Sequence, residues 1–205
     1  MRKIEKRSIF CLILAALLGL GLAFFCFQFV VDGGDWASYP YNRHLYNNAG
    51  QLKGGTILDR DGDMLSTLDE DGNRIYNDDA TVRRATLHAV GDKNGNIGAG
   101  SLTSFADKLS GYNLLTGVYS PLGTGNSLYL TIDAYLNNVA YQALNGMNGT
   151  VGVYNYKTGE ILCMVSTPTF DPANPPDIAA DDPAWDGVYV NRLLSANSIP
   201  GSIFK

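Results

Sequence analysis

The pattern of hydrophobic and polar positions begins with a long apolar segment. Residues 8–31 carry no charge, and residues 9–27 include no charged or strongly polar side chain. A helix of that length crosses the roughly 30 Å hydrocarbon core of a bilayer, at about 1.5 Å per residue. Apolar residues continue past Gly21 and Ala23, where a small-x-small site would allow cleavage, whereas the apolar region of a cleaved signal peptide is shorter. The pattern predicts an uncleaved transmembrane signal anchor.

Short stretches of alternating character follow, separated by turn residues. Residues 56–58 and 64–66 flank Asp61-Gly62, a pair typical of a tight hairpin turn. A second turn is marked by Asp71-Gly72. We therefore expect β-hairpins here, within a small β-rich domain.

Four acidic residues in this region, Asp59, Asp61, Asp63 and Glu70, are spaced like the ligands of a calcium-binding loop. The sixth position of such a loop requires glycine for its sharp turn, and here it is Met64. The flanking residues also have the pattern of strands, whereas a calcium loop of this kind lies between helices. These observations favour a hairpin over a metal site.

Helical periodicity is found in two later stretches. Apolar residues recur every three or four positions in residues 102–109, which end before Gly111, and in residues 136–144. Thr131 and Asp133 are candidate N-caps for the second stretch. Both stretches are predicted to be amphipathic helices.

Strand-like patterns occur in two further places. Residues 81–98 are predicted to hold a strand, a turn and a loop. Apolar residues alternate in 151–153 and 161–165, on either side of a tight turn at 157–159, which predicts a hairpin with one buried face. Prolines then populate residues 168–183, and long loops of this kind are usually functional or mobile. This mixture of strands and helices indicates the α+β class.

Charge is distributed unevenly along the chain. Four basic residues and one acidic residue precede the apolar segment, whereas 11 basic and 19 acidic residues follow it. The basic residues before the apolar segment, with Asp32 and Asp35 directly after it, predict a cytoplasmic N-terminus, a single pass through the cell membrane at residues 8–31, and an extracytoplasmic body. The acidic body argues against nucleic acid as a partner, since such binding depends on Lys and Arg contacts to phosphate.

The cysteines and histidines do not suggest a metal or redox site. Cys11 and Cys26 lie in the apolar segment and Cys163 lies in a predicted strand, so neither a disulfide framework nor a zinc site is expected. His88 has no carboxylate or cysteine at ligand spacing and is interpreted as structural. We expect no cofactor and no metal ion.

The C-terminal residues contain a candidate nucleophile. Ser202 and Lys205 are three positions apart, so on a helix they would share a face about 5–6 Å apart. A serine hydroxyl needs a neighbouring base, and a lysine amine becomes one when burial or a nearby cation lowers its pKa. The N-terminus of such a helix would also offer unpaired N–H groups to an oxyanion. By itself the pair favours a solvated helix end, because a chain of this composition produces such pairs by chance.

Several segments together, however, resemble the class B penicillin-binding proteins, the membrane-anchored peptidoglycan transpeptidases. The similarity begins with the basic-then-apolar start and continues through GGTILDRDGDMLS, HAVG, LYLTIDAYLNNVAYQAL and GTVGVYNYKTGEILCMVSTPTFDPANP to NRLLSANSIPGSIFK. The order and spacing of the segments carry the resemblance. Gly54 departs from the family pattern, which usually has arginine there.

The resemblance implies an enzyme that cross-links peptidoglycan stem peptides during cell-wall synthesis. It implies that Ser202 attacks the D-Ala-D-Ala bond with Lys205 as its base partner, and that β-lactams acylate the same serine. It also implies three parts: a basic end and anchor at 1–31, an extracytoplasmic N-terminal domain at 32–125, and the start of a transpeptidase domain at 126–205. That last domain would combine an antiparallel sheet with helices. Other cell-wall synthesis proteins are candidate partners.

The family site also requires a Ser-x-Asn and a Lys-Thr-Gly motif after the Ser-x-x-Lys motif. Lys157-Thr158-Gly159 precedes Ser202 and falls on a predicted hairpin turn, so it is interpreted as a coincidental match. The two later motifs would lie beyond Lys205. We therefore expect the chain to be an N-terminal fragment, inactive alone.

Two other interpretations stay open. One is a β-lactamase or a β-lactam sensor that uses the same serine, although a β-lactamase needs neither an uncleaved anchor nor the domain at 32–125. The other is a non-catalytic, membrane-anchored scaffold that binds cell-wall synthesis proteins through that domain.

Overall fold

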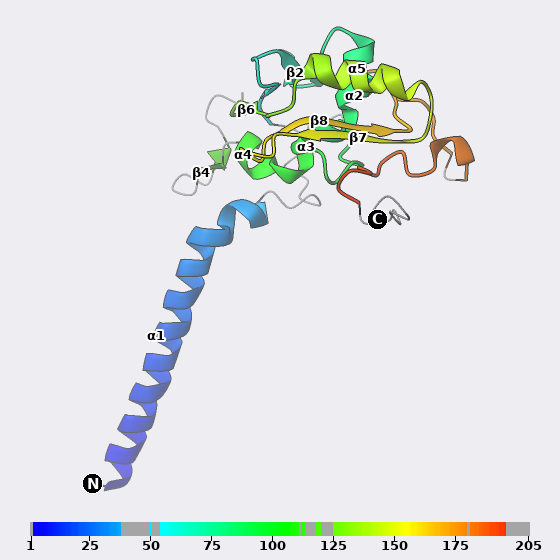
Figure 1. Ribbon diagram of the computed structural model, residues 1–205. Coiled ribbons are helices and arrows are strands. Elements are labelled where there is room, and N and C mark those ends of the chain that lie inside the picture. The colour runs from blue at the N-terminus through cyan, green and yellow to red at the C-terminus, as the bar shows by residue number, and fades with distance from the viewer. Residues whose placement is uncertain are drawn as a thin grey trace.

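The computed structural model describes residues 2–37, 50, 54–110, 112–113, 118–119, 125–179 and 181–195. The first helix, α1 (Arg2–Ala37), projects away from the other elements (Figure 1). Within it, Lys6–Gly33 is long and apolar enough to cross a membrane, and its apolar window is not buried against the protein. The apolar segment predicted at 8–31 is therefore confirmed as a helix, and its exposed apolar surface is consistent with membrane anchoring.

Two hairpins and one added strand form a four-stranded sheet in the order β3-β2-β1-β6. Its strands are β1 (Ile57–Leu58), β2 (Met64–Leu68), β3 (Arg74–Tyr76) and β6 (Leu128–Tyr129). β2 pairs antiparallel with both β1 and β3, so the two predicted hairpins are confirmed. β6, from the second half of the chain, pairs parallel with β1.

Both hairpin turns are closed by an aspartate that comes two positions before the turn pair. The Asp59 carboxylate accepts hydrogen bonds from the backbone N–H groups of Asp61 and Asp63, each at 2.9 Å. Asp69 does the same one hairpin later. Aspartate favours turns because its side chain replaces a backbone acceptor in this way. The spacing that imitates a calcium loop therefore belongs to a hairpin.

Gly54, which departs from the family pattern, occupies a backbone position that suits glycine. Its φ is +144°, and a Cβ placed there would lie 3.1 Å from the Cβ of Leu109. The buried guanidinium of Arg74 donates hydrogen bonds to the carbonyls of Gly54 and Gly55, at 3.1 and 2.8 Å. Burial lowers the pKa of Arg74 to about 10, so it stays charged at neutral pH.

A helix, α2 (Ala80–Val90), occupies the region where a strand was predicted within residues 81–98, and that prediction was wrong. The Asp79 side chain caps the helix by accepting the N–H of Thr81 at 2.7 Å, and Gly91 ends it. Residues 85–90 are all buried, so α2 is enclosed on several sides. The buried residues of α2 include the polar Thr86 and His88, so its buried face does not appear in the sequence as a continuous apolar stripe.

The helix predicted over 102–109 is present in two pieces that meet at Phe105. These are α3 (Ser101–Ser104) and α4 (Ala106–Ser110), and Leu102 and Leu109 are buried as expected from the periodicity. A small two-stranded sheet, β4 (Tyr112–Asn113) with β5 (Val118–Tyr119), follows.

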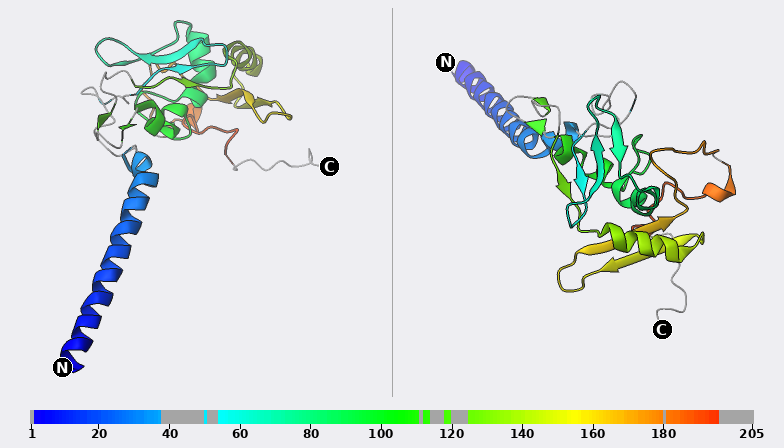
Figure 2. Two further views of the ribbon diagram at one scale, coloured as in Figure 1. Left: turned by 90° about the vertical axis from the view of Figure 1, so that its left-hand side faces the viewer. Right: turned by 90° about the horizontal axis from the view of Figure 1, so that it is seen from above.

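The second predicted helix and hairpin form a layered unit. The helix α5 (Ala134–Leu144) begins at Asp133, whose carboxylate accepts the N–H of Leu136 at 2.9 Å, so Asp133 is the N-cap. Strands β7 (Gly149–Tyr154) and β8 (Ile161–Thr167) pair antiparallel around the predicted turn. α5 lies along this hairpin (Figures 1 and 2), and Ala140, Cys163 and Val165 are buried between them.

Helix α2 occupies the centre of the fold. It packs against β2 of the four-stranded sheet and against both α5 and β8. Elements on either side of the predicted boundary at residues 125 and 126 therefore share a sheet and a core. The α+β class is confirmed, and the exact domain division stays a prediction. After β8, residues 168–195 contain one short 3₁₀ helix, η2 (Pro183–Trp185), among the described residues.

Candidate functional site

The described part of the predicted site is the segment that leads to it, residues 186–195. Ser202 and Lys205, the predicted nucleophile and base, lie outside the described residues. Ser202 follows Ser195 by seven positions. The contacts that hold residues 186–195 therefore fix the point from which the chain continues to the predicted serine.

Helix α2 holds this segment through a buried histidine. His88 is 1% exposed, and its Nε2 lies 2.8 Å from the carbonyl oxygen of Val188. A carbonyl only accepts hydrogen bonds, so Nε2 carries the proton. The other ring nitrogen, Nδ1, is buried and has no hydrogen-bond partner among the described residues. The Val188 side chain packs with Leu87, Ile97 and Phe170 in a small core on the same side of α2.

The ring of His88 is neutral at neutral pH. Burial lowers its pKa below the ordinary value of 6.5, and the nearby positive charge of Arg192 lowers it further. The hydrogen bond to Val188 requires a proton on Nε2, and the neutral ring supplies it in the tautomer that carries its proton there.

Asn191 and Arg192 attach the same segment to two elements. The Asn191 side-chain amide donates to the carbonyl of His88 at 3.3 Å, in α2. The Arg192 backbone N–H donates to the Ser166 hydroxyl at 3.0 Å, and its Nε donates to the carbonyl of Thr167 at 2.8 Å, both at the end of β8. The segment thus bridges α2 and the C-terminal end of β8.

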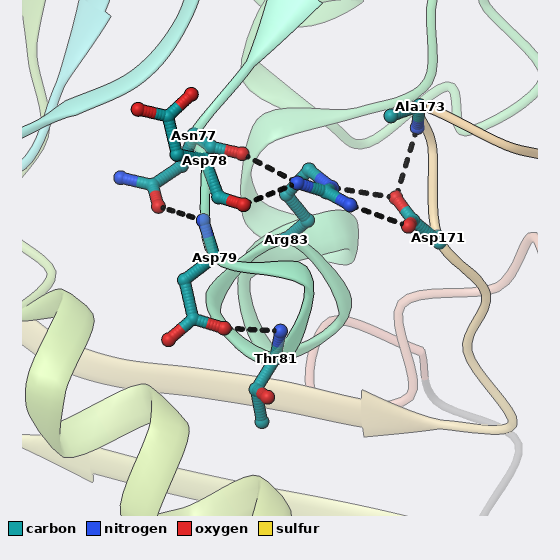
Figure 3. Close-up of polar contacts among 7 residues, drawn as sticks. All are labelled: Asn77, Asp78, Asp79, Thr81, Arg83, Asp171 and Ala173. Atoms are coloured by element: carbon teal, nitrogen blue, oxygen red, sulfur yellow. Dashed lines mark hydrogen bonds and ion pairs between the residues drawn. The ribbon is translucent and has the colours of Figure 1, made fainter.

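Helix α2 also holds the beginning of the loop. Nε and Nη2 of Arg83 donate to the two carboxylate oxygens of Asp171, each at 2.7 Å, and Nη1 donates to the carbonyls of Asn77 and Asp78 (Figure 3). The two charged side chains are 13% and 10% exposed. The hydrogen bonds from Arg83 hold the pKa of Asp171 below its ordinary value. Both ends of the loop at 168–195 are therefore attached to one helix.

A cavity of about 400 Å³ adjoins the end of the described segment. Its lining includes Thr150 of β7, Gly187, Arg192 and Ser195. Cavities of a few hundred Å³ are of the size that small ligands and peptide groups occupy. The cavity therefore lies beside the residues from which the chain continues to Ser202.

The Lys157-Thr158-Gly159 sequence lies at the exposed turn between β7 and β8, where the hairpin was predicted. The Thr158 hydroxyl donates to the Glu160 carboxylate at 2.9 Å, within the same turn. Its surroundings are those of an ordinary hairpin turn, in agreement with the interpretation of the sequence as a coincidental match.

Sequence reasoning missed the side chains that hold the loop. Arg83 and Asp171 were not singled out, since nothing in their local sequence indicates a partner 88 positions away. Asn191 and Arg192 were noticed only as part of a segment similar to the family. His88 was interpreted as structural, and its burial agrees with that interpretation.

Comparisons with known proteins identify one family match and several similar chains. Residues 149–205 match the family model of the penicillin-binding protein transpeptidase domain. The chain is 37% identical to the peptidoglycan D,D-transpeptidase MrdA of Acinetobacter baumannii, over 40% of this chain and 13% of that protein. It is 34% identical to the peptidoglycan D,D-transpeptidase PbpA of Mycolicibacterium smegmatis, over 40% of this chain and 19% of that protein.

Solved structures with some likeness include the D,D-transpeptidase domain of a peptidoglycan glycosyltransferase from Eggerthella lenta. It is 28% identical with a TM-score of 0.48, over 68% of this chain and 32% of that one. Pseudomonas aeruginosa PBP2 in complex with WCK 5153 is 23% identical with a TM-score of 0.45, over 60% of this chain and 29% of that one.

The family match and the curated relatives confirm the resemblance to the class B penicillin-binding proteins. The chain spans between about one eighth and one fifth of the length of the two curated relatives described above. The matched region, 149–205, includes β7, β8, the segment at 186–195 and both predicted catalytic residues.

Proposed function

We propose that the protein to which this chain belongs is an acyl-serine D,D-transpeptidase that cross-links peptidoglycan stem peptides. The observation that carries the proposal is the transpeptidase-domain match over 149–205, which extends through Ser202 and Lys205. The relatives named peptidoglycan D,D-transpeptidase add support from two different bacteria. Residues 126–205 would then be the beginning of the catalytic domain, and residues 32–125 an extracytoplasmic N-terminal domain.

The proposed reaction proceeds in two acyl transfers. The Ser202 hydroxyl oxygen attacks the carbonyl carbon of the penultimate D-alanine, and its proton passes to the neutral amine of Lys205. The terminal D-alanine leaves with that proton, and an ester remains on Ser202. An amine of a neighbouring stem peptide then attacks the ester, so that an amide forms and Ser202 regains its proton. A β-lactam would acylate the same oxygen by opening its ring.

The membrane helix fits this function because the substrate lies outside the cytoplasm. We propose that α1 anchors the protein as a single pass with the N-terminus in the cytoplasm. The four basic residues before the apolar segment, and the lack of Lys and Arg in the sequence from its end to Arg43, support this orientation. Other cell-wall synthesis proteins remain proposed partners, reached through the extracytoplasmic part.

The proposal is tested with the full-length protein in detergent. A stem peptide ending in D-Ala-D-Ala and an amine acceptor are supplied, and released D-alanine and the cross-linked product are measured by mass spectrometry. We expect both products from the unmodified protein and neither from Ser202→Ala. Lys205→Met should lower the rate by about 100- to 10,000-fold, the usual effect of losing a general base.

The same experiment separates the alternative functions. Turnover of a β-lactam without release of D-alanine from the peptide indicates a β-lactamase. A stable β-lactam adduct without any reaction of the peptide indicates a sensor. A scaffold shows neither reaction, and its Ser202→Ala variant still complements a deletion of the gene.

A further inference from the structure

We propose that His88 is a positioning residue for Ser202: through its hydrogen bond to Val188, helix α2 fixes the segment from which the chain continues to the serine. The inference rests on the proposed function, because it concerns the same serine. His88 acts through residues 186–195 and is not itself assigned a catalytic step.

The geometry ties His88 to the segment at two points. Its ring donates to the carbonyl of Val188 at 2.8 Å, and its own backbone carbonyl accepts from the Asn191 side chain at 3.3 Å. The two contacts lie three positions apart on the segment and come from one residue of α2. A pair of contacts of this kind restrains both the position and the direction of the chain between them.

The polar ring is costly at this position, which indicates that its hydrogen bond matters. His88 is 1% exposed, and within the described part of the chain its Nδ1 has no hydrogen-bond partner. A leucine would fill a buried space of this kind without leaving a polar atom unsatisfied. What histidine adds over leucine is a donor to the Val188 carbonyl.

One side chain of the segment also contacts β7. A Cβ added to Gly152 of β7 would lie 2.5 Å from a terminal methyl of Leu193, so the backbone of the strand and this side chain are in close contact. Helix α2 holds the segment on another side, and Arg192 attaches it to β8. Three elements therefore contact the segment. Removing the His88 contact frees it on the side of α2. A misplacement of about 1 Å at a reacting group can lower a rate by about 100-fold, and a partial displacement should cost less.

The test compares three variants of the full-length protein by the time course of acylation with a fluorescent penicillin. In such a time course, the amplitude reports the fraction of correctly folded protein, and the rate constant reports how well the serine is placed. His88→Leu removes the donor, and His88→Gln keeps an amide that can donate to Val188. Val90→Ala is the matched control, because Val90 is equally buried in α2 but packs in a different hydrophobic cluster, which includes Ile57 and Leu65.

We expect His88→Leu to lower the acylation rate constant by about 10-fold, an intermediate effect for a partial displacement. His88→Gln should recover to within about threefold of the unmodified protein, and Val90→Ala should change the amplitude alone. If His88→Leu does not fold, His88→Asn replaces it, because its shorter amide leaves the Val188 carbonyl unbound, and the same 10-fold loss is expected.

Two results overturn the inference while leaving the proposed function intact. In one, His88→Leu (or His88→Asn, where it replaces His88→Leu) is acylated as fast as the unmodified protein. In the other, Val90→Ala slows acylation as much as the His88 variant, which would mean that any weakening of α2 has the same effect. If the unmodified protein is not acylated at all, the proposed function fails, and the inference fails with it.

Discussion

The hairpins at residues 54–76 and the loop at 168–195 are built in opposite ways. In the hairpins, Asp59 and Asp69 close their turns by accepting hydrogen bonds from backbone groups two and four positions away. In the loop, the Arg83 and Asp171 pair joins residues 88 positions apart, and the His88 and Val188 bond joins residues 100 positions apart. The hairpins are specified by their own sequence, whereas the loop takes its shape from a helix far upstream.

This difference has a consequence for stability. A local turn closes a short stretch of chain and can form independently of the remaining fold. The loop must close long stretches of chain, and the entropy cost is recovered only when α2 is already folded and in place. The part of the molecule that leads to the predicted serine therefore depends on the integrity of the N-terminal region.

The largest effect should come from breaking the ion pair at the start of the loop. We expect Arg83→Met to lower the free energy of unfolding by about 3 kcal/mol, because it leaves the Asp171 carboxylate largely buried without its partner. Chemical denaturation of the full-length protein in detergent measures the loss. Arg84→Met is the matched control on the same helix, since Arg84 is exposed, and it should change stability little. Equal losses for the two variants would show that the loop does not depend on this pair.

A second experiment compares two equivalent turns that differ in burial. Asp59 is 1% exposed, and its second carboxylate oxygen also accepts the N–H of Ala134 at 3.1 Å. Asp59→Ala should cost about 2 kcal/mol, because several backbone N–H groups lose their acceptor, including a buried one. Asp69→Ala removes the same kind of turn at the surface, where water replaces the lost acceptor, and its cost should be clearly smaller. A larger loss for Asp69→Ala would mean that burial does not set the strength of these turns.

The smallest effect concerns pH. Because burial lowers the pKa of His88 in the folded state, the unfolded state binds the proton more readily. The contribution of the neutral ring is complete above the ordinary value of 6.5 and is lost as the pH falls from there through the folded-state value. His88→Gln should remove this part of the pH dependence, measured by denaturation between pH 7.5 and about 5. The carboxylate of Asp171 titrates at lower pH still, so it does not interfere. Identical pH profiles for the two proteins would contradict this assignment.

The accuracy of the sequence-based predictions follows the same division. The apolar helix, the two early hairpins, α5 and the hairpin of β7 and β8 were predicted, because their signals are apolar length, turn residues, capping and periodicity within a few positions. Helix α2 was missed, because its buried face includes the polar residues Thr86 and His88 and so does not show as an apolar stripe. The parallel pairing of β6 with β1 was missed because it joins distant segments.

The candidate site shows the same contrast. Ser202 and Lys205 are predicted from a local motif and from the family resemblance, and the family match extends over both positions. The side chains that hold the approach to them, Arg83, Asp171 and Asn191, carry no local signal of their role. A single sequence contains no information on which residues meet across 88 or more positions, and the three-dimensional fold supplies it.

Peptide mapping of the full-length protein after exposure to a penicillin tests the central claim most directly. The account predicts a single covalent adduct with the mass of the opened β-lactam, on the peptide that contains Ser202, and none in Ser202→Ala. An adduct on any other residue, or no adduct on a protein that is folded by denaturation analysis, would contradict it.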